Sequence, residues 1–150
     1  MKTTLIRSRL AMQKLAGQMA REVLGARQRR VNRHATVIAL SGELGSGKTT
    51  FSQGFLKALG VKQAVISPTF LIIRRYGLKK LSFTSAFHID CYRIERPEEL
   101  VALSLKEIVS NPEYIVLIEW PELVKKYLPK DTLWIYLRHG VKKNEKTITY

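Results

Sequence analysis

The hydrophobic pattern of the chain begins with two short runs of apolar and β-branched residues. Residues 35–40 (ATVIAL) and 114–119 (YIVLIE) show no regular alternation with polar positions. Such runs are typical of strands buried on both faces of a sheet, because a solvated face would impose alternation. Residues 8–27 and 48–59 instead carry apolar side chains at roughly helical intervals, and Gly60 is well placed to end the second segment. The pattern therefore predicts buried strands packed against amphipathic helices.

A hairpin is predicted in the middle of the chain. Residues 69–76 and 81–89 are both strand-like, and only residues 77–80 separate them. Since so short a connection cannot join parallel strands, we expect the pair to be antiparallel. The later elements are expected to be one or two helices from Pro97, another helix from Pro121, and strands at 133–137 and 146–150. No internal repeat or low-complexity linker interrupts this order, so residues 1–150 are predicted to form one domain.

The charge of the chain indicates the kind of partner it binds. There are 26 basic and 12 acidic residues, a net charge of +14, and residues 1–34 hold nine of the basic side chains against the single acid Glu22. This balance indicates affinity for nucleic acid or for an acidic protein, and charge alone does not choose between them. The densest cluster before the first strand consists of Arg27, Arg29, Arg30 and Arg33. That cluster is either a solvated connector or a contact for RNA or a partner.

Composition also bears on the compartment. No apolar run is long enough to span a bilayer, and the N-terminus lacks the apolar region of a signal peptide. We expect a soluble cytoplasmic protein without membrane contact. Cys91 is the only cysteine, which excludes an internal disulfide and argues against a cysteine-based zinc site.

The strongest chemical signal is a phosphate-loop motif. Residues 42–49 (GELGSGKT) match the pattern Gly-x-x-x-x-Gly-Lys-Thr and lie between a predicted strand and a predicted helix. Three glycines and the small Ser46 allow successive amide N–H groups to turn inward around a phosphate. Lys48 can supply a positive charge to the β and γ phosphates, and the Thr49 hydroxyl can ligate Mg²⁺. The motif predicts a nucleoside triphosphate site, with ATP as the default ligand.

Two acids at the ends of predicted strands complete the candidate chemistry. Glu119 directly follows an apolar run and is placed like a Walker B acid that contacts Mg²⁺ or its water. Asp90 could ligate Mg²⁺, directly or through water, or orient an attacking water. Strand alternation puts His88 on the same face as Asp90, and His88 is expected to pack or hydrogen-bond rather than bind metal. Arg93 could pair with phosphate or with Asp90.

A Ser-Pro-Thr segment adds a further candidate. The hydroxyls of Ser67 and Thr69 flank a rigid proline and either reach a γ-phosphate or Mg²⁺, or simply form a turn into the next strand. Strands mixed with helices around one phosphate loop predict an α/β fold. It is expected to be a three-layer P-loop NTPase-like domain with a mixed sheet that includes the antiparallel hairpin and a ligand at the strand carboxyl ends.

Five short motifs occur in a fixed order along the chain: SGELGSGKTTF, SPTF, HIDCYR, PEEL and IEW. In this order and spacing they resemble the bacterial TsaE (YjeE) family, small P-loop ATPases of tRNA threonylcarbamoyladenosine (t6A) synthesis. The resemblance covers nearly the whole chain. It implies an ATPase that is slow alone and works with TsaB and TsaD, which carry out the carbamoyl chemistry. Contact with tRNA is expected through that complex, or weakly through the basic N-terminal region.

The resemblance also implies site residues. The ATP phosphates would be wrapped by Glu43, Leu44, Gly45, Ser46, Gly47, Lys48, Thr49 and Thr50. Thr49 and Glu119 would hold Mg²⁺, and Asp90 would be the further acid needed for hydrolysis, so Lys48, Asp90 and Glu119 are the catalytic candidates. Ser67 and Thr69 match a switch-like segment, and Trp120 follows the metal acid as it does in the family.

Departures from the family pattern are modest, and two other functions stay open. Glu43 stands where aspartate is usual, and Met12 lies about where a threonine often approaches the nucleotide. A small-molecule or nucleoside kinase would use the same loop, but we find no arginine-rich lid and little chain left for an acceptor site. A basic RNA-binding module with a nucleotide switch is the third possibility.

Overall fold

The computed structural model describes residues 1–27, 33–66, 72–79, 82–102 and 104–150. Its strands are β1 (Thr3–Ile6), β2 (Thr36–Gly42), β3 (Ile73–Gly77), β4 (Ser85–Asp90), β5 (Tyr114–Glu119), β6 (Leu133–His139) and β7 (Lys146–Thr149). Its helices are α1 (Arg9–Arg27), α2 (Lys48–Ala58), α3 (Pro97–Ala102), α4 (Leu105–Ser110) and the 3₁₀ helix η1 (Pro121–Tyr127). None of the helices in the described residues combines the length and the apolar composition that spanning a bilayer requires.

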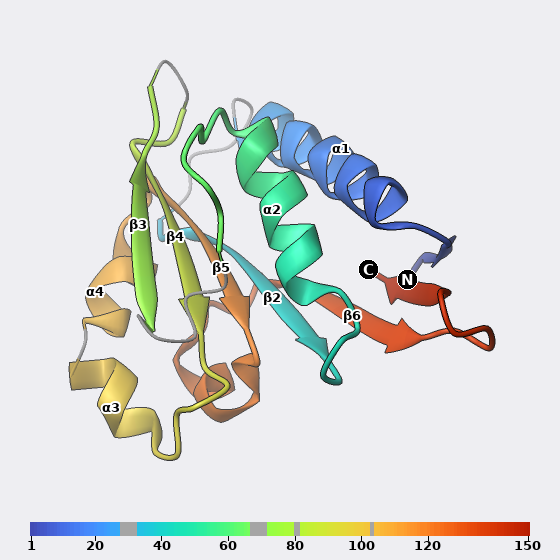
Figure 1. Cartoon of the computed structure of the whole chain (residues 1–150). Helices are drawn as coiled ribbons and strands as arrows, with labels where there is room; N and C mark the ends of the chain where they lie inside the picture. Colours follow the sequence, from blue (N-terminus) through green and yellow to red (C-terminus); the bar gives the residue numbers. More distant parts are fainter. Residues whose placement is uncertain (28–32, 67–71, 80–81, 103) are drawn as a thin grey trace.

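All seven strands form one mixed sheet in the order β1-β7-β6-β2-β5-β4-β3. Strands β6, β2, β5 and β4 are mutually parallel, whereas β3 and β7 run antiparallel to their neighbours. Helices α1 and α2 lie side by side on one face, and α3 and α4 lie on the other side of the sheet (Figure 1). The predicted three-layer α/β fold with an antiparallel hairpin is confirmed.

The central strands are apolar throughout because helices cover both of their faces. On the α1/α2 face, Ile38, Leu40 and Leu117 pack with Phe51 and Phe55. On the opposite face, Val37, Val116 and Ile118 pack in a separate cluster that includes buried residues of α3, α4 and η1. Alternate residues of β2 and β5 therefore enter different cores, which explains why polar and apolar positions do not alternate in the two runs.

Several element boundaries differ from the predictions. Strand β4 begins at Ser85 rather than at residue 81, because the connection is longer than expected: the Leu78 amide donates to the Thr84 carbonyl at 2.9 Å. The helix opened by Pro121 is a 3₁₀ helix. Strand β1 was not predicted at all; it pairs antiparallel with β7 at the other end of the chain, so its four residues carry no local signal of their partner.

A close helix contact gives a testable stability prediction. A Cβ atom on Gly54 of α2 would lie 2.6 Å from the backbone of Gln13 in α1. We expect Gly54→Ala to lower the free energy of unfolding by about 1–3 kcal/mol, because the helices must separate to admit a methyl group. Gly25 of α1 has no atom within 4 Å of the same position. Gly25→Ala should therefore raise stability by roughly 0.5–1 kcal/mol through helix propensity. Urea denaturation of both variants checks the pair, and equal effects would contradict it.

Candidate functional site

The site forms where three neighbouring strands end. Strand β5 lies between β2 and β4, with Leu40 opposite Glu119 on one side and Asp90 opposite Glu119 on the other. The carboxyl end of β2 leads into the phosphate loop, and the carboxyl ends of β4 and β5 carry the two acids. Parallel pairing therefore brings together residues that are up to 79 positions apart in the sequence at one edge of the sheet.

Glycine is required at both ends of the phosphate loop. A Cβ atom on Gly42 would collide with the Leu137 carbonyl oxygen of β6, so β2 can approach β6 only without a side chain there. Gly47 has a φ of 105°, in the left-handed region, and α2 begins at the next residue. This geometry directs the start of α2, with its unpaired amide groups, toward the loop.

Lys48 is held across the loop in this structure. Its Nζ donates to the carbonyl oxygens of Gly42 at 2.6 Å and Glu43 at 2.9 Å. The same ammonium lies 3.7 Å from the centre of the Trp120 ring. Burial lowers the pKa of the Lys48 amine, while the carboxylates of Glu119, Glu122 and Asp90 oppose the shift. The side chain is thus a nearly buried cation beside two backbone carbonyls and an aromatic face.

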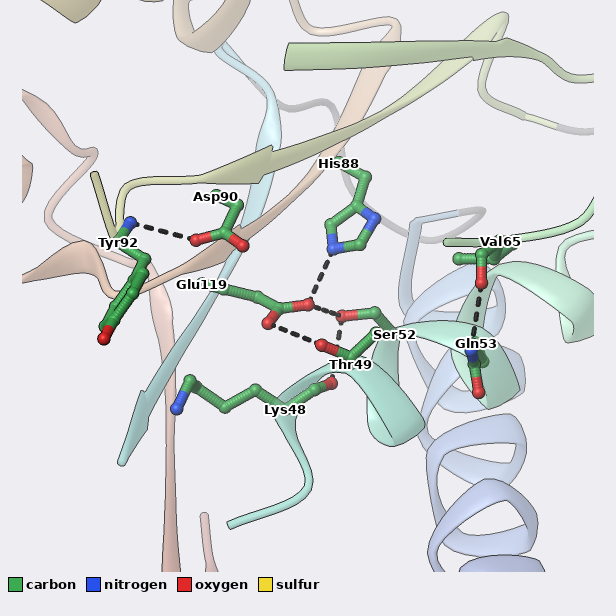
Figure 2. A network of polar contacts seen from close by, with 9 residues as sticks. All are labelled: Lys48, Thr49, Ser52, Gln53, Val65, His88, Asp90, Tyr92 and Glu119. Carbon is green, nitrogen blue, oxygen red and sulfur yellow. Dashed lines mark hydrogen bonds and ion pairs between the residues drawn. The ribbon is translucent and has the colours of Figure 1, made fainter. Parts of the chain in front are cut away.

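Glu119 accepts three hydrogen bonds. Its Oε2 accepts from the Thr49 hydroxyl at 3.1 Å. Its Oε1 lies 3.0 Å from the Ser52 hydroxyl and 2.7 Å from Nε2 of His88. Figure 2 shows this group of side chains converging on the carboxylate from α2 and β4. The carboxylate is only 2% exposed, so these donors replace the water that it would otherwise bind.

Asp90 is held by its own turn. Its Oδ1 accepts a hydrogen bond from the Tyr92 amide at 2.9 Å, which fixes the carboxylate at the end of β4 (Figure 2). The Tyr92 ring packs against the Trp120 ring with a centre-to-centre distance of 5.1 Å. Trp120 has a φ of 58°, an unusual value for a residue with a side chain, and the αR alternative is disfavoured by Pro121 after it. This backbone presents the indole between Tyr92 and Lys48.

These residues enclose a cavity of about 320 Å³. Its walls are the loop residues Leu44, Gly45, Gly47, Lys48, Thr49 and Thr50, and on the other side Asp90, Tyr92, Glu119 and Trp120. The predicted convergence of Lys48, Asp90 and Glu119 on one site is therefore observed. A cavity of this size, with backbone donors, a cation and carboxylates in its walls, can hold a phosphate chain and a bound cation.

A second cavity of about 460 Å³ adjoins the first and shares Gly45, Gly47 and Thr50 with it. Its other walls come from both ends of the chain: residues 6–9 and Met12, and Lys143, Asn144 and Lys146. Met12 near the start of α1 is buried and lines this cavity, so α1 helps to form a wall beside the loop. The two cavities together extend from Asp90 past the loop to the N-terminal segment.

The remaining predicted residues lie less centrally. Glu43 is exposed, and Ser46 is buried beneath the loop with no hydrogen-bond partner for its hydroxyl among the described residues. Arg93 is exposed in the turn after β4 and does not line the 320 Å³ cavity. Ser67 and Thr69 lie outside the described residues. Burial raises the pKa of the Cys91 thiol to about 12, with Asp90 and Glu122 adding to the shift, so the thiol stays protonated.

Sequence reasoning missed two contributors to the site. Ser52 was not considered, although it lies three residues after Thr49 and therefore on the same face of α2. Tyr92 follows Asp90 by two positions and lines the cavity. His88 was expected to hydrogen-bond, but Glu119 was not foreseen as its partner. The helical period could have indicated Ser52 as a neighbour of Thr49, whereas Tyr92 lies in the turn after β4, where strand alternation no longer applies.

In an α/β fold, a glycine loop that leads from a central strand into a helix and faces acids at neighbouring strand ends defines a protein of the phosphate-loop class. The family model described as threonylcarbamoyl adenosine biosynthesis protein TsaE matches residues 2–148. The chain therefore belongs to the TsaE family, which is involved in t6A biosynthesis, and the resemblance in the motifs is confirmed.

Individual relatives agree with this assignment. The chain is 38% identical over 114 residues to the tRNA threonylcarbamoyladenosine biosynthesis protein TsaE of Bacillus subtilis, covering 76% of this chain and 68% of the relative. It is 37% identical over 98 residues to the protein of that name from Borreliella burgdorferi, covering 65% and 69%. The crystal structure of Bacillus subtilis YdiB superposes with a TM-score of 0.72 at 25% identity, covering 98% of this chain and 82% of that one.

Proposed function

We propose that this protein is a Mg²⁺-dependent ATPase that supports t6A modification of tRNA together with TsaB and TsaD homologues. The observation that carries the proposal is the placement of Lys48, Thr49, Asp90 and Glu119 around one cavity beneath a glycine loop. Burying an ammonium and two carboxylates costs free energy, and a site for an uncharged ligand would gain nothing from these charges.

The phosphate chain would lie in the 320 Å³ cavity. The loop amides donate to phosphate oxygens, and the positive end of α2 favours the same charge. Lys48 would exchange its two carbonyl partners for the β and γ phosphates, because a charged acceptor binds an ammonium more strongly than a carbonyl does. Asp90 is proposed to orient the attacking water from the opposite wall. In that role it would supply the further acid that hydrolysis needs.

The residues present also fit a magnesium ion. Mg²⁺ prefers a few protein oxygen ligands completed by phosphate and water, and the Thr49 hydroxyl and Glu119 carboxylate already lie 3.1 Å apart. Among the described residues no group of three or more His, Cys, Asp and Glu side chains could hold a metal ion alone. Two oxygen ligands, from Thr49 and Glu119, suit a magnesium ion whose other ligands are phosphate oxygens and water. When bound, the ion would neutralise charge on the β and γ phosphates.

The base and ribose would occupy the second cavity. Met12 and Ile6 offer apolar surface there, whereas Arg7, Arg9, Lys143 and Lys146 give it a cationic rim. ATP is the proposed nucleotide, as the default for a phosphate loop of this family.

TsaB and TsaD homologues are the proposed partners, and the cytoplasm is the proposed compartment. The experiment is to mix the purified chain with both proteins and measure ATP hydrolysis with Mg²⁺ present. We expect slow hydrolysis by the chain alone and stimulation of about tenfold or more in the mixture, a coupling of ordinary size for interacting proteins. Absence of stimulation, or faster phosphorylation of a nucleoside than hydrolysis, would favour the kinase instead. Addition of tRNA to the isolated chain at low salt tests direct contact, which should weaken steeply as salt is raised.

A further inference from the structure

His88 is a fully buried imidazole at the edge of the site, and the proposed function gives it no role. It lies on β4, two residues before Asp90 and therefore on the same face of the sheet. Its Nε2 is 2.7 Å from Oε1 of Glu119, and neither side chain is more than 2% exposed. Its Nδ1 is buried and has no hydrogen-bond partner among the described residues. The only polar contact of the ring within this part of the chain is therefore the carboxylate.

The direction of this hydrogen bond follows from the chemistry of the two groups. An ionised carboxylate has no hydrogen to donate, so Nε2 must carry the proton and donate it to Oε1. An imidazole buried with an unpaired Nδ1 costs free energy, since that nitrogen loses its hydrogen bond to water. The arrangement is stable because the bond at Nε2 joins a donor to a buried charge, and such bonds are stronger than neutral ones.

The other two donors to Glu119 constrain the carboxylate less. The Ser52 hydroxyl has one hydrogen but two acceptors in reach, Glu119 at 3.0 Å and the Lys48 carbonyl at 3.1 Å. The Thr49 hydroxyl bonds the opposite oxygen, Oε2, and is the proposed magnesium ligand. His88 is rigid, has a single acceptor, and contacts only Oε1. With Oε1 held on the β4 side, Oε2 is left facing Thr49 and the phosphate loop (Figure 2).

We propose that His88 is a positioning residue that fixes the Glu119 carboxylate so that Oε2 faces the Mg²⁺–nucleotide. This inference rests on the proposed function, because it assigns His88 a role through Glu119. His88 itself does not reach the ligand: it does not line the 320 Å³ cavity, and its Nε2 is occupied by the carboxylate.

Two isosteric substitutions test the role of Nε2 directly. The amide nitrogen of glutamine reaches about as far as Nε2 of histidine, whereas that of asparagine reaches only as far as Nδ1. Since Nδ1 has no partner among the described residues, His88→Asn restores no donor to Glu119, and His88→Gln does. Calorimetric titration with ADP, in Mg²⁺ and in EDTA, separates the magnesium-dependent part of nucleotide affinity from the rest.

We expect His88→Asn to lose about 10–100-fold of the magnesium-dependent affinity and a similar factor in hydrolysis, as is usual when the partner of a metal-binding side chain is removed. His88→Gln should keep most of both, and ADP affinity in EDTA should be unchanged in the two variants. If His88 had only a structural role, both variants would have a lower melting temperature, and the magnesium-dependent part of their ADP affinity would be the same.

Each outcome decides the matter. Wild-type magnesium dependence in a folded His88→Asn protein would overturn the inference while leaving the proposed function intact. If the wild-type chain bound ADP with no magnesium dependence, or did not bind it, the proposed function would fail and this inference with it. Should His88→Asn not fold, His88→Phe keeps a ring of similar shape without a donor and is expected to show the same loss.

Discussion

Lys48→Ala is expected to abolish measurable ATP binding. Among the described residues that line the 320 Å³ cavity, Lys48 carries the only cationic side chain. Its ammonium is nearly buried, so its interaction with phosphate is poorly screened. Charge-assisted hydrogen bonds of this kind contribute about 1.5–3 kcal/mol each. With two phosphates as partners, affinity should fall by at least about 100-fold. Calorimetric titration with ADP and ATP measures the loss directly, without depending on turnover.

A second lysine of the same helix provides the control. Lys57 is exposed in the last turn of α2 and lies outside both cavities that adjoin the loop. Lys57→Ala removes the same charge from the chain, so it reports the effect of net charge alone. We expect its nucleotide affinity to stay within about threefold of wild type at moderate salt. Lys57 lies at the opposite end of α2 from the phosphate loop, and salt screens the interaction of an exposed charge with a distant phosphate. Equal losses in the two variants would show that general electrostatic attraction, and not the loop, binds the nucleotide.

The phosphate loop could be predicted from sequence because its signal is local. Eight consecutive residues supply the glycines, the lysine and the hydroxyl, and the flanking apolar run and helix give their context. Asp90 and Glu119 could be predicted with one more assumption, that strand ends meet at one edge of the sheet. The register that pairs Asp90 with Glu119 satisfies that assumption.

The rest of the site depends on contacts between distant elements. The bond from His88 to Glu119 requires a particular register of β4 on β5, and that from Ser52 requires a particular rotation of α2. Neither quantity is encoded in a window of neighbouring residues. The left-handed backbone of Trp120 is a similar case, because Pro121 disfavours the αR conformation but leaves the extended conformation open. In the observed left-handed conformation, the Trp120 ring contacts Lys48 and Tyr92, which lie on other elements.

Asp90→Asn and Glu119→Gln are expected to separate binding from turnover. Neither acid donates to the phosphate chain, so both variants should retain ATP binding better than turnover, and Glu119→Gln should lose only the magnesium-dependent part of the affinity. Asp90→Asn should lower hydrolysis by about 10²–10⁴-fold, the range found when a group that activates water is lost. The neutral amide cannot attract a proton from that water. Its remaining oxygen can still accept the hydrogen bond from the Tyr92 amide, so the fold should be retained.

Glu119→Gln differs because of the three donors around the carboxylate. One oxygen of glutamate becomes an NH₂ group, which must then face Thr49 on one side or Ser52 and His88 on the other. Facing His88, the NH₂ group would oppose the imidazole N–H, so it is expected to face Thr49, whose hydroxyl oxygen can accept a hydrogen bond from it. The bonds from His88 and Ser52 then end on a neutral amide oxygen instead of a charged carboxylate, so we expect a loss of about 1–3 kcal/mol in unfolding free energy in addition to the loss of turnover. Asp90→Asn should show the catalytic loss without the stability loss. Single-turnover hydrolysis and thermal denaturation of both variants test this difference, and unchanged hydrolysis in the two would refute the assignment of the acids.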